Sequence, residues 1–444
     1  MARIGLIGLW HLGTVAAAGL ASLGHAVRAT DPDGATVAAL GRGEPPVYEP
    51  GLTEAVARAC AEGRLQFVAT VAEAVDGADA VYVTFDTPVD ESDRSDLAPI
   101  FAAIDAIVQA APRISPGAFV VVMSQVPVGT MAQIAARLAR APALEARLIY
   151  QPENLRLGCA LETFLAPDFL VVGSAEATHA QDFLCLYSRM ITHPLPMSWE
   201  SAELSKHAVN AFLATSISFA NELADLAEVS GADVREVIRV LRQDRRIGPH
   251  SFLDPGPGFS GGTLARDLQT LRGAGAAASL PTPLLDAALE VNRGRLPRLA
   301  RRVGSACGGL RGATIALLGL TYKPGTSTLR RSAALEFAAR LRGAGARVRA
   351  HDPQVRTACA QTRGLTLAAD AYEAARGADA VVLMTPWPEF RSLDFARLRA
   401  SLAQPVLVDA HNFLDCGAAR AAGLSYWGVG LGSAAPQSLT AGAR

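Results

Sequence analysis

The N-terminal part of the chain restricts the fold more than any other stretch. Arg3–Ile7 is a short apolar run typical of a buried strand, and a glycine-containing turn, Gly8–Gly13, leads into an apolar helical stretch that ends near Leu23. A second strand, Val27–Thr30, ends at Asp31. A strand, a glycine turn, a helix, a strand and an acid in this order are typical of a dinucleotide-binding fold. The pattern therefore predicts a parallel sheet connected by crossover helices.

The same alternation continues along the chain and then begins a second time. Further buried strands are expected in two groups, and helical spacing separates the strands of each group. The expected strands are Ala80–Thr84, Phe119–Met123 and Leu148–Tyr150 in the first group, and Ala313–Leu318, Val348–His351, Ala380–Met384 and Val406–Asp409 in the second. The fold class is therefore α/β, with two Rossmann-like doubly wound domains.

A long helix is expected between the two groups of strands. The alternation breaks at Pro194-Leu195-Pro196, and residues 201–230 are then apolar at helical spacing without a proline or a glycine. A helix of about 30 residues is longer than usual in globular proteins, so we expect it to link domains or to pack against a second chain. Helical character resumes from Asp267 to about Arg302. The expected segments are 1–197, 198–302 and 303–435, followed by a flexible tail at 436–444.

Charge and composition exclude several classes of protein. A net charge of −1 over 444 residues is a poor match for a nucleic-acid-binding surface. No uninterrupted apolar stretch reaches the length of a membrane span, which predicts no membrane association. Gly8, Trp10 and His11 interrupt the apolar N-terminal stretch, so we expect it to belong to the fold and not to a signal peptide. The predicted location is the cytoplasm.

The cysteines fit the same prediction. Six of them are scattered along the chain with no CxxC pair and no spacing suited to a metal site. This pattern is typical of reduced, mostly buried thiols in a cytoplasmic protein, and it predicts no bound metal.

A glycine-rich run in the middle of the chain carries the strongest functional signal. It reads Gly256-Pro257-Gly258-Phe259-Ser260-Gly261-Gly262-Thr263-Leu264-Ala265-Arg266-Asp267. Four glycines in seven residues let a backbone pass close to a ligand, although composition alone favours a surface turn equally. With Arg245-Arg246-Ile247-Gly248 and Phe252-Leu253 before it, the run resembles the active-site loop of the UDP-glucose/GDP-mannose dehydrogenases, particularly the UDP-glucose branch. The family pattern is R-I-G, F-L and G-x-G-x-G-G-x-C-F-P-K-D, and Thr263 stands at its cysteine.

This resemblance extends over residues 2 to 432 and implies a reaction. Family enzymes oxidise a primary alcohol of a nucleotide sugar to an acid in two hydride transfers to NAD. The family's cysteine captures the intermediate aldehyde, and water then cleaves the resulting thioester. By resemblance, residues 1–197 bind NAD, residues 303–435 bind the UDP end of the substrate, and the long helix in 198–302 forms the core of a homodimer.

The resemblance assigns catalytic roles to a small set of residues. Ala202-Glu203-Leu204-Ser205-Lys206 and Asn210 resemble the family's A-E-x-x-K-x-x-x-N, in which the lysine steadies the substrate oxyanion. A polar helix stripe of this kind is otherwise typical of solvated surface. Asn210 and Asp267 would hold the reacting group, and Glu153, in Gln151-Pro152-Glu153-Asn154-Leu155, would assist proton transfer.

Binding residues follow from the same motifs. For the cofactor, the resemblance implies Gly8, Trp10, His11, Leu12, Gly13, Asp31, Thr87, Gln125 and Arg330. For a UDP-linked substrate, it implies Glu153, Leu155, Lys206, Asn210, Arg246, Phe252, Leu253, Gly258, Gly262, Tyr322 and Lys323. Asp31 would accept hydrogen bonds from the adenosine ribose, although a turn-forming role in Asp31-Pro32-Asp33-Gly34 is an alternative.

The departures from the family pattern gather in the second half of the reaction. Thr263 offers a hydroxyl in place of a thiolate, which is a far poorer nucleophile without an adjacent base. Gln125 and Leu157 replace the groups that position the hydrolytic water. Cys159 is an alternative nucleophile, against the simpler interpretation of a small buried thiol.

Two further departures affect the cofactor. Trp10 takes the place of the second glycine of the dinucleotide turn, and Asp86 introduces a carboxylate where the family has a glycine. The leading hypothesis is a divergent NAD-dependent UDP-sugar dehydrogenase that does not complete the oxidation to the uronic acid. The alternative is a non-catalytic nucleotide-sugar-binding homologue that pairs with an active dehydrogenase.

Overall fold

The structure is a computed structural model that describes residues 1–87, 95–188, 190 and 193–432. The chain divides into two compact units, Met1–Val209 and Asn210–Arg444. The expected tail at 436–444 lies outside the described residues.

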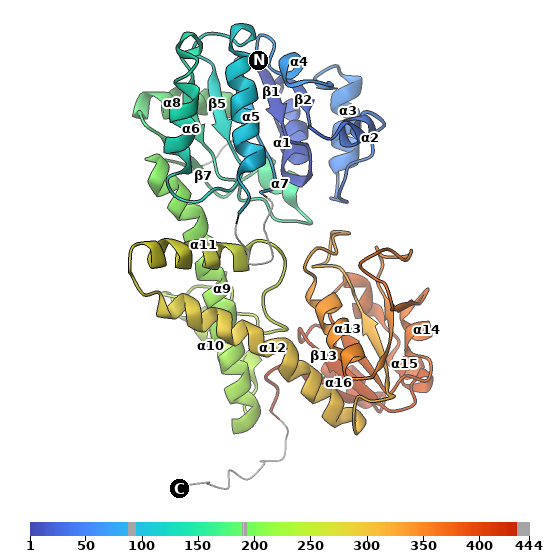
Figure 1. The fold of residues 1–444 in the computed structure, drawn as a ribbon. Helices are drawn as coiled ribbons and strands as arrows, with labels where there is room; N and C mark the ends of the chain where they lie inside the picture. The colour runs from blue at the N-terminus through green and yellow to red at the C-terminus, as the bar shows by residue number, and fades with distance from the viewer. Residues whose placement is uncertain (88–94, 189, 191–192, 433–444) are drawn as a thin grey trace. The chain divides into compact units, whose positions relative to one another are not determined.

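The described part of the first unit contains an eight-stranded sheet, in the order β3-β2-β1-β4-β5-β6-β7-β8 (Figure 1). Its strands are β1 (Arg3–Ile7), β2 (Ala26–Thr30), β3 (Leu65–Phe67), β4 (Ala80–Val83), β5 (Phe119–Val122), β6 (Arg147–Tyr150), β7 (Leu170–Ser174) and β8 (Pro194–Met197). The strands from β3 to β6 pair in parallel, which confirms the doubly wound prediction. Strands β7 and β8 depart from it, because β7 pairs antiparallel to β6 and β8 pairs in parallel with β7.

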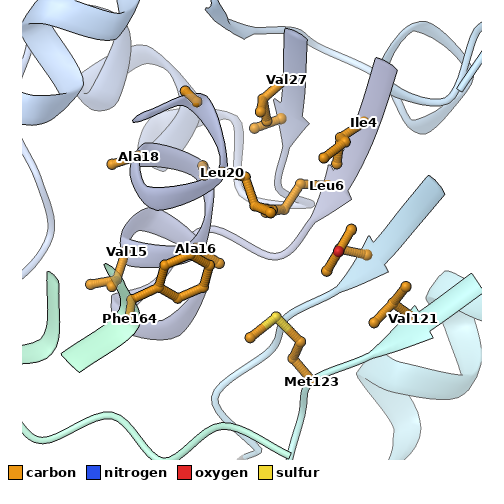
Figure 2. Close-up of a cluster of buried hydrophobic side chains, with 14 of the residues drawn as sticks. Ile4, Leu6, Val15, Ala16, Ala18, Leu20, Val27, Val121, Met123 and Phe164 are labelled. Atoms are coloured by element: carbon orange, nitrogen blue, oxygen red, sulfur yellow. The ribbon is translucent and has the colours of Figure 1, made fainter. Parts of the chain in front are cut away.

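Helices cover both faces of this sheet. They are α1 (His11–Ser22), α2 (Gly34–Gly41), α3 (Leu52–Ala61), α4 (Val71–Ala74), α5 (Ala98–Gln109), α6 (Thr130–Leu138), α7 (Ala160–Leu165) and α8 (Ala177–Leu184). Alternate residues of each strand enter opposite cores, so that Leu6 packs beneath α1 while Ile7 packs on the face covered by α5 and α6. Figure 2 shows Phe164 of α7 beside Val15 and Ala16 in the α1 core.

The predicted break at Pro194-Leu195-Pro196 is wrong. These residues belong to β8, which pairs in parallel with β7 at the edge of the sheet. Proline is tolerated at an edge because the missing N–H group is not needed by a further strand.

The long helix α9 (Trp199–Ser230) has 32 residues and runs across the division between the units. Three more helices follow it in the second unit: α10 (Val234–Gln243), α11 (Leu264–Ala277) and α12 (Pro283–Cys307). The expected continuous helical stretch from Asp267 to Arg302 is therefore interrupted at residues 278–282. Pro281 and Pro283 explain the interruption, since proline cannot continue a helix but is accepted in its first turn.

The described part of the second unit also holds a six-stranded parallel sheet, in the order β11-β10-β9-β12-β13-β14. Its strands are β9 (Thr314–Leu318), β10 (Arg347–His351), β11 (Thr366–Leu367), β12 (Ala380–Leu383), β13 (Val406–Asp409) and β14 (Ser425–Gly428). The helices beside it are α13 (Ala333–Gly343), α14 (Ala371–Ala375), α15 (Phe395–Ser401) and α16 (Cys416–Ala421). Two Rossmann-like sheets and a helical region are thus present, as predicted.

The prediction of mostly buried thiols is wrong. All six cysteines are free, but Cys60, Cys185 and Cys359 are exposed, and the other three are partly exposed. Cysteine is small enough to be accepted at the surface of a helix, so a scattered pattern does not specify burial.

Candidate active site

The turn after β1 has the backbone of a dinucleotide-binding turn. Gly8 has a φ of +104°, a backbone conformation that is strained for any residue with a side chain. A Cβ on Gly13 would lie 1.7 Å from the carbonyl oxygen of Gly8, so only glycine lets α1 begin this close to the strand. Trp10, which stands between these glycines at the N-cap of α1, has 37% of its surface exposed. The indole therefore lies at the surface of the turn and not in the core.

Two acidic side chains accept hydrogen bonds from backbone N–H groups of this turn. Asp31, at the end of β2, accepts a hydrogen bond from the backbone N–H of Leu9 at 2.7 Å. Asp86, which follows β4, accepts one from the backbone N–H of Leu12 at 3.0 Å. The N-terminus of a helix attracts anions because its first N–H groups lack partners within the helix. One of these groups on α1 is therefore bound to the chain's own carboxylate.

A buried pair of a histidine and a glutamate, His11 and Glu49, links the turn to the start of α7. Nε2 of His11 lies 3.0 Å from Oε2 of Glu49, and both side chains are almost fully buried. Burial, the largest influence, lowers the pKa of His11, but the hydrogen bond to Glu49 and the charge of Asp86 outweigh it and raise the pKa. The second oxygen of Glu49 accepts a hydrogen bond from the N–H of Ala160, at the start of α7. The side chain of His11 is thus held inside the domain by Glu49.

The predicted lysine and glutamate lie together in the first unit. Nζ of Lys206, on α9, is 3.7 Å from Oε1 of Glu153, and only 6% of the lysine side chain is exposed. Lys206 also donates to Oδ1 of Asn154 at 3.4 Å. The other oxygen of Glu153 accepts from the N–H of Leu155 at 2.6 Å, which fixes the carboxylate toward the lysine. A buried ammonium group with a hydrogen-bonded carboxylate is suited to stabilising a developing negative charge.

Gln125 contacts a histidine that the motif did not single out. Its Nε2 atom lies 3.3 Å from Nδ1 of His207, whose other ring nitrogen lies 2.9 Å from the carbonyl oxygen of Val126. The hydroxyl of Thr87 donates to the backbone carbonyl of Gln125 at 2.7 Å. These contacts hold the strand ends of β4 and β5 against α9.

Glu203 is also placed by α9, but it has a structural role. Its two oxygens accept hydrogen bonds from the N–H groups of Gly129 and Met131 at 2.7 and 2.8 Å, at the start of α6. Burial raises the pKa of Glu203, and these backbone donors oppose that rise. This glutamate therefore fixes the α6 loop to α9.

The glycine-rich loop of the second unit packs tightly against aromatic and cationic side chains. A Cβ on Gly261 would lie 2.5 Å from the ring of Tyr322, and the N–H of Gly261 donates to the carbonyl of Arg331 at 2.9 Å. A Cβ on Gly258 would lie 2.4 Å from Oδ1 of Asn292. Gly262 lies beside the guanidinium group of Arg330. Packing therefore requires glycine at positions 258 and 261, and the turn interpretation alone does not explain these two residues.

Asn210 and Asp267 are brought together as the motif predicts. The side-chain amide of Asn210 donates to Oδ2 of Asp267, and Nε of Arg266 lies 3.3 Å from Oδ1 of the same carboxylate. All three side chains are buried. Thr263 is exposed at the N-cap of α11, and within the described residues its hydroxyl has no hydrogen-bond partner. Within the described part of the second unit, the threonine at the family's cysteine position is therefore not hydrogen-bonded to a base.

The remaining predicted residues of the second unit differ in their exposure. Leu253 is buried, whereas Phe252 is 49% exposed. Arg246 projects into solvent and pairs with Asp244 at 2.6 Å. Burial raises the pKa of Tyr322, and Lys323 is partly buried beside it.

Family models match all three parts of the chain. The NAD binding domain of the UDP-glucose/GDP-mannose dehydrogenase family matches residues 2–191, its central domain residues 200–294, and its UDP binding domain residues 316–416. The chain belongs to the UDP-glucose/GDP-mannose dehydrogenase family. Within the described ranges, no helix is both long enough and apolar enough to cross a membrane.

Individual relatives agree with this assignment. The UDP-glucose 6-dehydrogenase of Rhizobium meliloti (strain 1021) is 38% identical over 420 residues, which are 92% of this chain and 95% of that protein. A UDP-glucose dehydrogenase structure from Pyrobaculum islandicum has a TM-score of 0.89 at 35% identity and covers 97% of this chain and 98% of its own. The UDP-D-ManNAc dehydrogenase of Pyrococcus horikoshii has a TM-score of 0.84 at 25% identity, covering 97% and 99%.

The family assignment makes NAD the cofactor expected in the first domain, and most of the turn fits it. The Gly8–Gly13 backbone and the carboxylate at the end of β2 are the parts that a dinucleotide needs. The exception is Asp86, because a pyrophosphate and a carboxylate compete for the same N–H groups of α1. The glycines and Asp31 thus fit NAD, whereas the hydrogen bond from Leu12 to Asp86 opposes its pyrophosphate.

Sequence reasoning missed His11's partner Glu49, and it missed Asn154 and His207. Glu49 lies in Glu49-Pro50-Gly51-Leu52, and His207 directly follows Lys206, so both adjoin residues that resemble the family. Neither motif indicates which side chain each would contact.

Proposed function

We propose that this chain is a divergent NAD-dependent UDP-sugar dehydrogenase that oxidises an alcohol to the aldehyde and does not form the uronic acid. The observation that carries the proposal is Thr263, an exposed hydroxyl without a base at the position where the family pattern has a cysteine. We propose that the chain has three functional segments: a cofactor-binding domain at 1–197, a central domain at 198–302 and a UDP-binding domain at 303–435.

The first oxidation requires a group that stabilises the developing alkoxide. Lys206 supports this role because its buried ammonium group is within 3.7 Å of Glu153 and keeps a hydrogen bond to Asn154. A buried charge acts strongly because little water screens it. Glu153 would accept the proton of the alcohol, and bound NAD would supply the hydride acceptor.

The hydrogen-bonded pair Asn210 and Asp267 supports the positioning of the sugar. Lys206 and Asn210 lie four residues apart on α9 and therefore on one face of it. The carboxylate of Asp267 is fixed by Asn210 and Arg266, so its orientation does not depend on a ligand. A preorganised polar group of this kind holds a substrate hydroxyl without a rearrangement of the protein.

Residues of the second unit support binding of the UDP end. The ring of Tyr322 lies against Gly261, and the guanidinium group of Arg330 lies beside Gly262. An aromatic ring suits a base and a guanidinium group suits a phosphate. We therefore assign Tyr322 and Lys323 to the nucleotide part of the substrate, and Arg330 to a phosphate group.

The second oxidation is the step that this chain lacks. Conversion of an aldehyde to an acid through the enzyme needs a nucleophile whose adduct loses hydride and is then hydrolysed. A threonine hydroxyl without a base remains protonated at neutral pH and attacks poorly. Cys159 is not a replacement in this scheme, because it lies at the N-cap of α7, where its sulfur contacts Thr163.

The test is the ratio of NADH to UDP-sugar consumed. UDP-glucose and UDP-D-ManNAc are each incubated with the purified full-length chain and NAD, and the products are separated by mass spectrometry. We expect one NADH for each sugar and an aldehyde product. Two NADH for each sugar, with accumulation of the uronic acid, would overturn the proposal.

A gain-of-function variant sharpens the test. Thr263→Cys should raise uronic acid formation by at least about tenfold, because a thiol is a much better nucleophile than an alcohol. Ser260→Cys, on the same loop, is the matched control and should leave the ratio unchanged. Equal acid formation by wild type and Thr263→Cys would contradict the role given to residue 263.

A second candidate function rests on Asp86. Its hydrogen bond to Leu12 opposes pyrophosphate binding, which favours a non-catalytic subunit that binds a nucleotide sugar and pairs with an active homologue. Calorimetry separates the two candidates. UDP-sugar binding without measurable NAD binding would support the non-catalytic subunit, whereas binding of both supports the dehydrogenase.

We also propose that the chain forms a homodimer through α9. Phe212, Phe219 and Leu226 recur every seven residues on this helix and are 72%, 48% and 61% exposed. A stripe of large apolar residues at this spacing lies on one helix face and is unfavourable in water. Light scattering should give a dimer for the wild type and a monomer for Phe212→Ser/Phe219→Ser, and a monomeric wild type would contradict the proposal.

A further inference from the structure

Four arginines surround a pocket at the amino-terminal edge of the second sheet. The pocket has a volume of about 520 Å³ and is lined by Arg342, Arg347, Arg349 and Arg376, together with Thr314 and Gly377. Arg347 and Arg349 come from β10, Arg342 from the last turn of α13, and Arg376 from the loop after α14. Ligands of this fold class bind at the opposite, carboxyl-terminal edge of the sheet, so this pocket is separate from the UDP region.

The partners of these arginines carry no compensating charge. Arg342 donates to the carbonyl of Arg363 at 3.2 Å, and Arg347 donates to the carbonyl of Gly312 at 2.9 Å. Arg349 donates to the carbonyl of Arg376. Within the described part of the chain, none of the four lining guanidinium groups forms an ion pair. A carbonyl satisfies a hydrogen bond but leaves the positive charge uncancelled, so the pocket keeps a positive potential.

One donor in the pocket is left without a partner. Nε of Arg349 is buried and forms no hydrogen bond. A buried N–H group without an acceptor is unfavourable by about 1–3 kcal/mol. The guanidinium group of Arg349 is therefore not fully satisfied by acceptors of the chain itself.

The first sheet has an equivalent pocket with a different balance of charge. It measures about 530 Å³ and is lined by Arg3, Arg28 and Arg113. Here Asp76 lies 4.0 Å from the guanidinium group of Arg28 and 3.7 Å from that of Arg113. Each arginine of this pocket has an acidic partner, because Arg3 lies 3.5 Å from Asp79.

The two pockets occupy corresponding places in the two folds. Arg28 pairs with Gly5 on β1, and Arg349 pairs with Ala316 on β9, the third residue of each strand counted from Arg3 and Thr314. The loops before β4 and β12 read E-A-V-D-G-A-D-A-V from residue 73 and E-A-A-R-G-A-D-A-V from residue 373. The second aspartate of the first loop is kept, since Asp79 and Asp379 each accept a backbone N–H at 2.8 Å. Between these two loops, the only difference in charge is Asp76 in the first and Arg376 in the second.

Helix dipoles do not explain the whole cluster. Arg342 and Arg376 lie near the carboxyl-terminal ends of α13 and α14, where a cation is favourable. Arg347 and Arg349 lie on a strand, where no such dipole acts. Two strand arginines on one side of β10, facing two further arginines, repel one another unless an anion lies between them.

We propose that this pocket binds a compound with two or more phosphate groups, such as a diphosphate or a nucleoside diphosphate. Planar guanidinium groups bind phosphate oxygens in pairs, and four of them exceed what a single phosphate needs. The volume of the pocket accommodates more than one phosphate group. The site is independent of the proposed dehydrogenase reaction, because none of its residues belongs to the predicted catalytic or binding set.

Calorimetry with inorganic diphosphate tests the proposal on the full-length chain. Saturating UDP-glucose is present throughout, so that the substrate site is occupied. We expect saturable binding that weakens as salt is raised. Absence of binding at millimolar diphosphate, with UDP-glucose at its own site, would overturn the proposal. A nucleoside diphosphate, ADP, is the second probe, and tighter binding of ADP than of diphosphate assigns the ligand to the nucleotide class.

Substitutions of the pocket arginines test whether they bind the diphosphate. Arg376→Asp restores the arrangement of the first pocket, and its exposed position preserves the fold. It should weaken diphosphate binding by at least about tenfold, as expected for loss of a charged hydrogen-bond donor. Arg347→Met/Arg349→Met should do the same. Arg28→Met, in the first pocket, is the matched control and should have no effect. Wild-type affinity in Arg376→Asp, with an unchanged circular dichroism spectrum, would overturn the assignment.

Discussion

The two parallel sheets repeat one backbone plan but differ in the charges at their edges. After the first strand of each sheet, a glycine with positive φ precedes an N–H group that donates to an aspartate. The pair is Leu9 with Asp31 in the first sheet and Leu320 with Asp352 in the second. Among the described residues, the first sheet has a further carboxylate, Asp86, at the start of the following helix, where the second sheet has the hydroxyl of Ser332 as N-cap. The shared contacts therefore build the fold, whereas the added charges decide what each edge can bind.

The amino-terminal edges of the two sheets also differ in charge, but here it is the second sheet that carries the additional charged residue, and that charge is positive. At the amino-terminal edge, Asp76 neutralises arginines in the first sheet, and Arg376 adds a positive charge at the same place in the second. In the proposal made above, this single difference in charge separates a pocket that binds an anion from one that does not. The comparison yields predictions that distinguish residues needed for the backbone fold from charged residues that affect ligand binding.

The largest effect is expected from Gly13→Ala in the first sheet. The new Cβ would lie 1.7 Å from the carbonyl oxygen of Gly8, so strand and helix must move apart. We expect a loss of about 3 kcal/mol in the free energy of unfolding of the first domain. Gly343→Ala on α13 is the control, since open space surrounds that position. Hydrogen exchange read separately on α1 and α13 peptides measures both, and equal protection in the two variants would contradict the packing argument.

The shared aspartates should differ in their contribution to stability. One oxygen of the buried Asp352 accepts hydrogen bonds from the N–H groups of Leu320 and Thr321 and from the indole of Trp387, at 2.6 to 3.1 Å. Asp31 is less buried and accepts from backbone groups alone. Asp352→Asn should reduce stability by about 3 kcal/mol and Asp31→Asn by about 1 kcal/mol. Urea denaturation measures both losses, and equal values would break the comparison.

The charge added in the first sheet should act on the cofactor and not on the fold. Asp86→Asn keeps the shape of the side chain and removes its repulsion for a pyrophosphate at Leu12. We expect NAD affinity to rise about tenfold, which corresponds to about 1.4 kcal/mol. Glu54→Gln, on the exposed face of α3, removes the same charge from the same domain and is the control. Calorimetry with NAD measures the change, and an unaltered affinity would show that Asp86 does not oppose the cofactor.

The smallest effect is expected from two histidines whose pKa values move in opposite directions. The hydrogen bond to Glu49, with nearby acids, outweighs burial and raises the pKa of His11. Burial lowers the pKa of His411 in the second sheet, despite the charge of Asp409. An unfolded histidine titrates near pH 6.5. His11 therefore stabilises the fold below about pH 6.5, and this contribution is lost as the pH rises through its raised pKa.

For His411 the sign is reversed, because the folded protein prefers the neutral ring. Its contribution is present above about pH 6.5 and is lost as the pH falls toward the lowered pKa. His11→Gln should therefore destabilise most at low pH, and His411→Gln most at high pH. Melting temperatures measured between pH 5 and pH 8 give the two slopes, and slopes of the same sign would contradict the assignment.

The elements with a strong pattern followed directly from the sequence. The run Arg3–Ile7 is apolar and short, and it became β1 as expected. The prediction failed where local chemistry and tertiary context disagreed. Pro194 and Pro196 indicate a break, yet an edge strand accepts them because one side of β8 needs no further partner. The apolar residues after Asp267 keep a helical spacing beyond Pro281. The structure nevertheless has two helices here, because α11 ends at Ala277 and α12 begins at Pro283.

The candidate site was predictable in its members but not in its contacts. The family motifs indicated Lys206 and Glu153, and the structure places them 3.7 Å apart. The motifs did not indicate that His207 would contact Gln125, because each motif describes one segment of the chain. Which segments meet depends on how the strand ends of β4 and β5 close against α9.

The sequence by itself determined the fold class, the family and the substitution at Thr263, since these depend on residue type and spacing. Only the tertiary structure decided that Asp86 binds the N–H of Leu12, 74 residues away, and that His11 pairs with Glu49. The arginine pocket beside Arg376 was decided in the same way, because its members come from a helix, a strand and a loop. Charge acts through space, so its effect becomes visible only once distant segments are folded together.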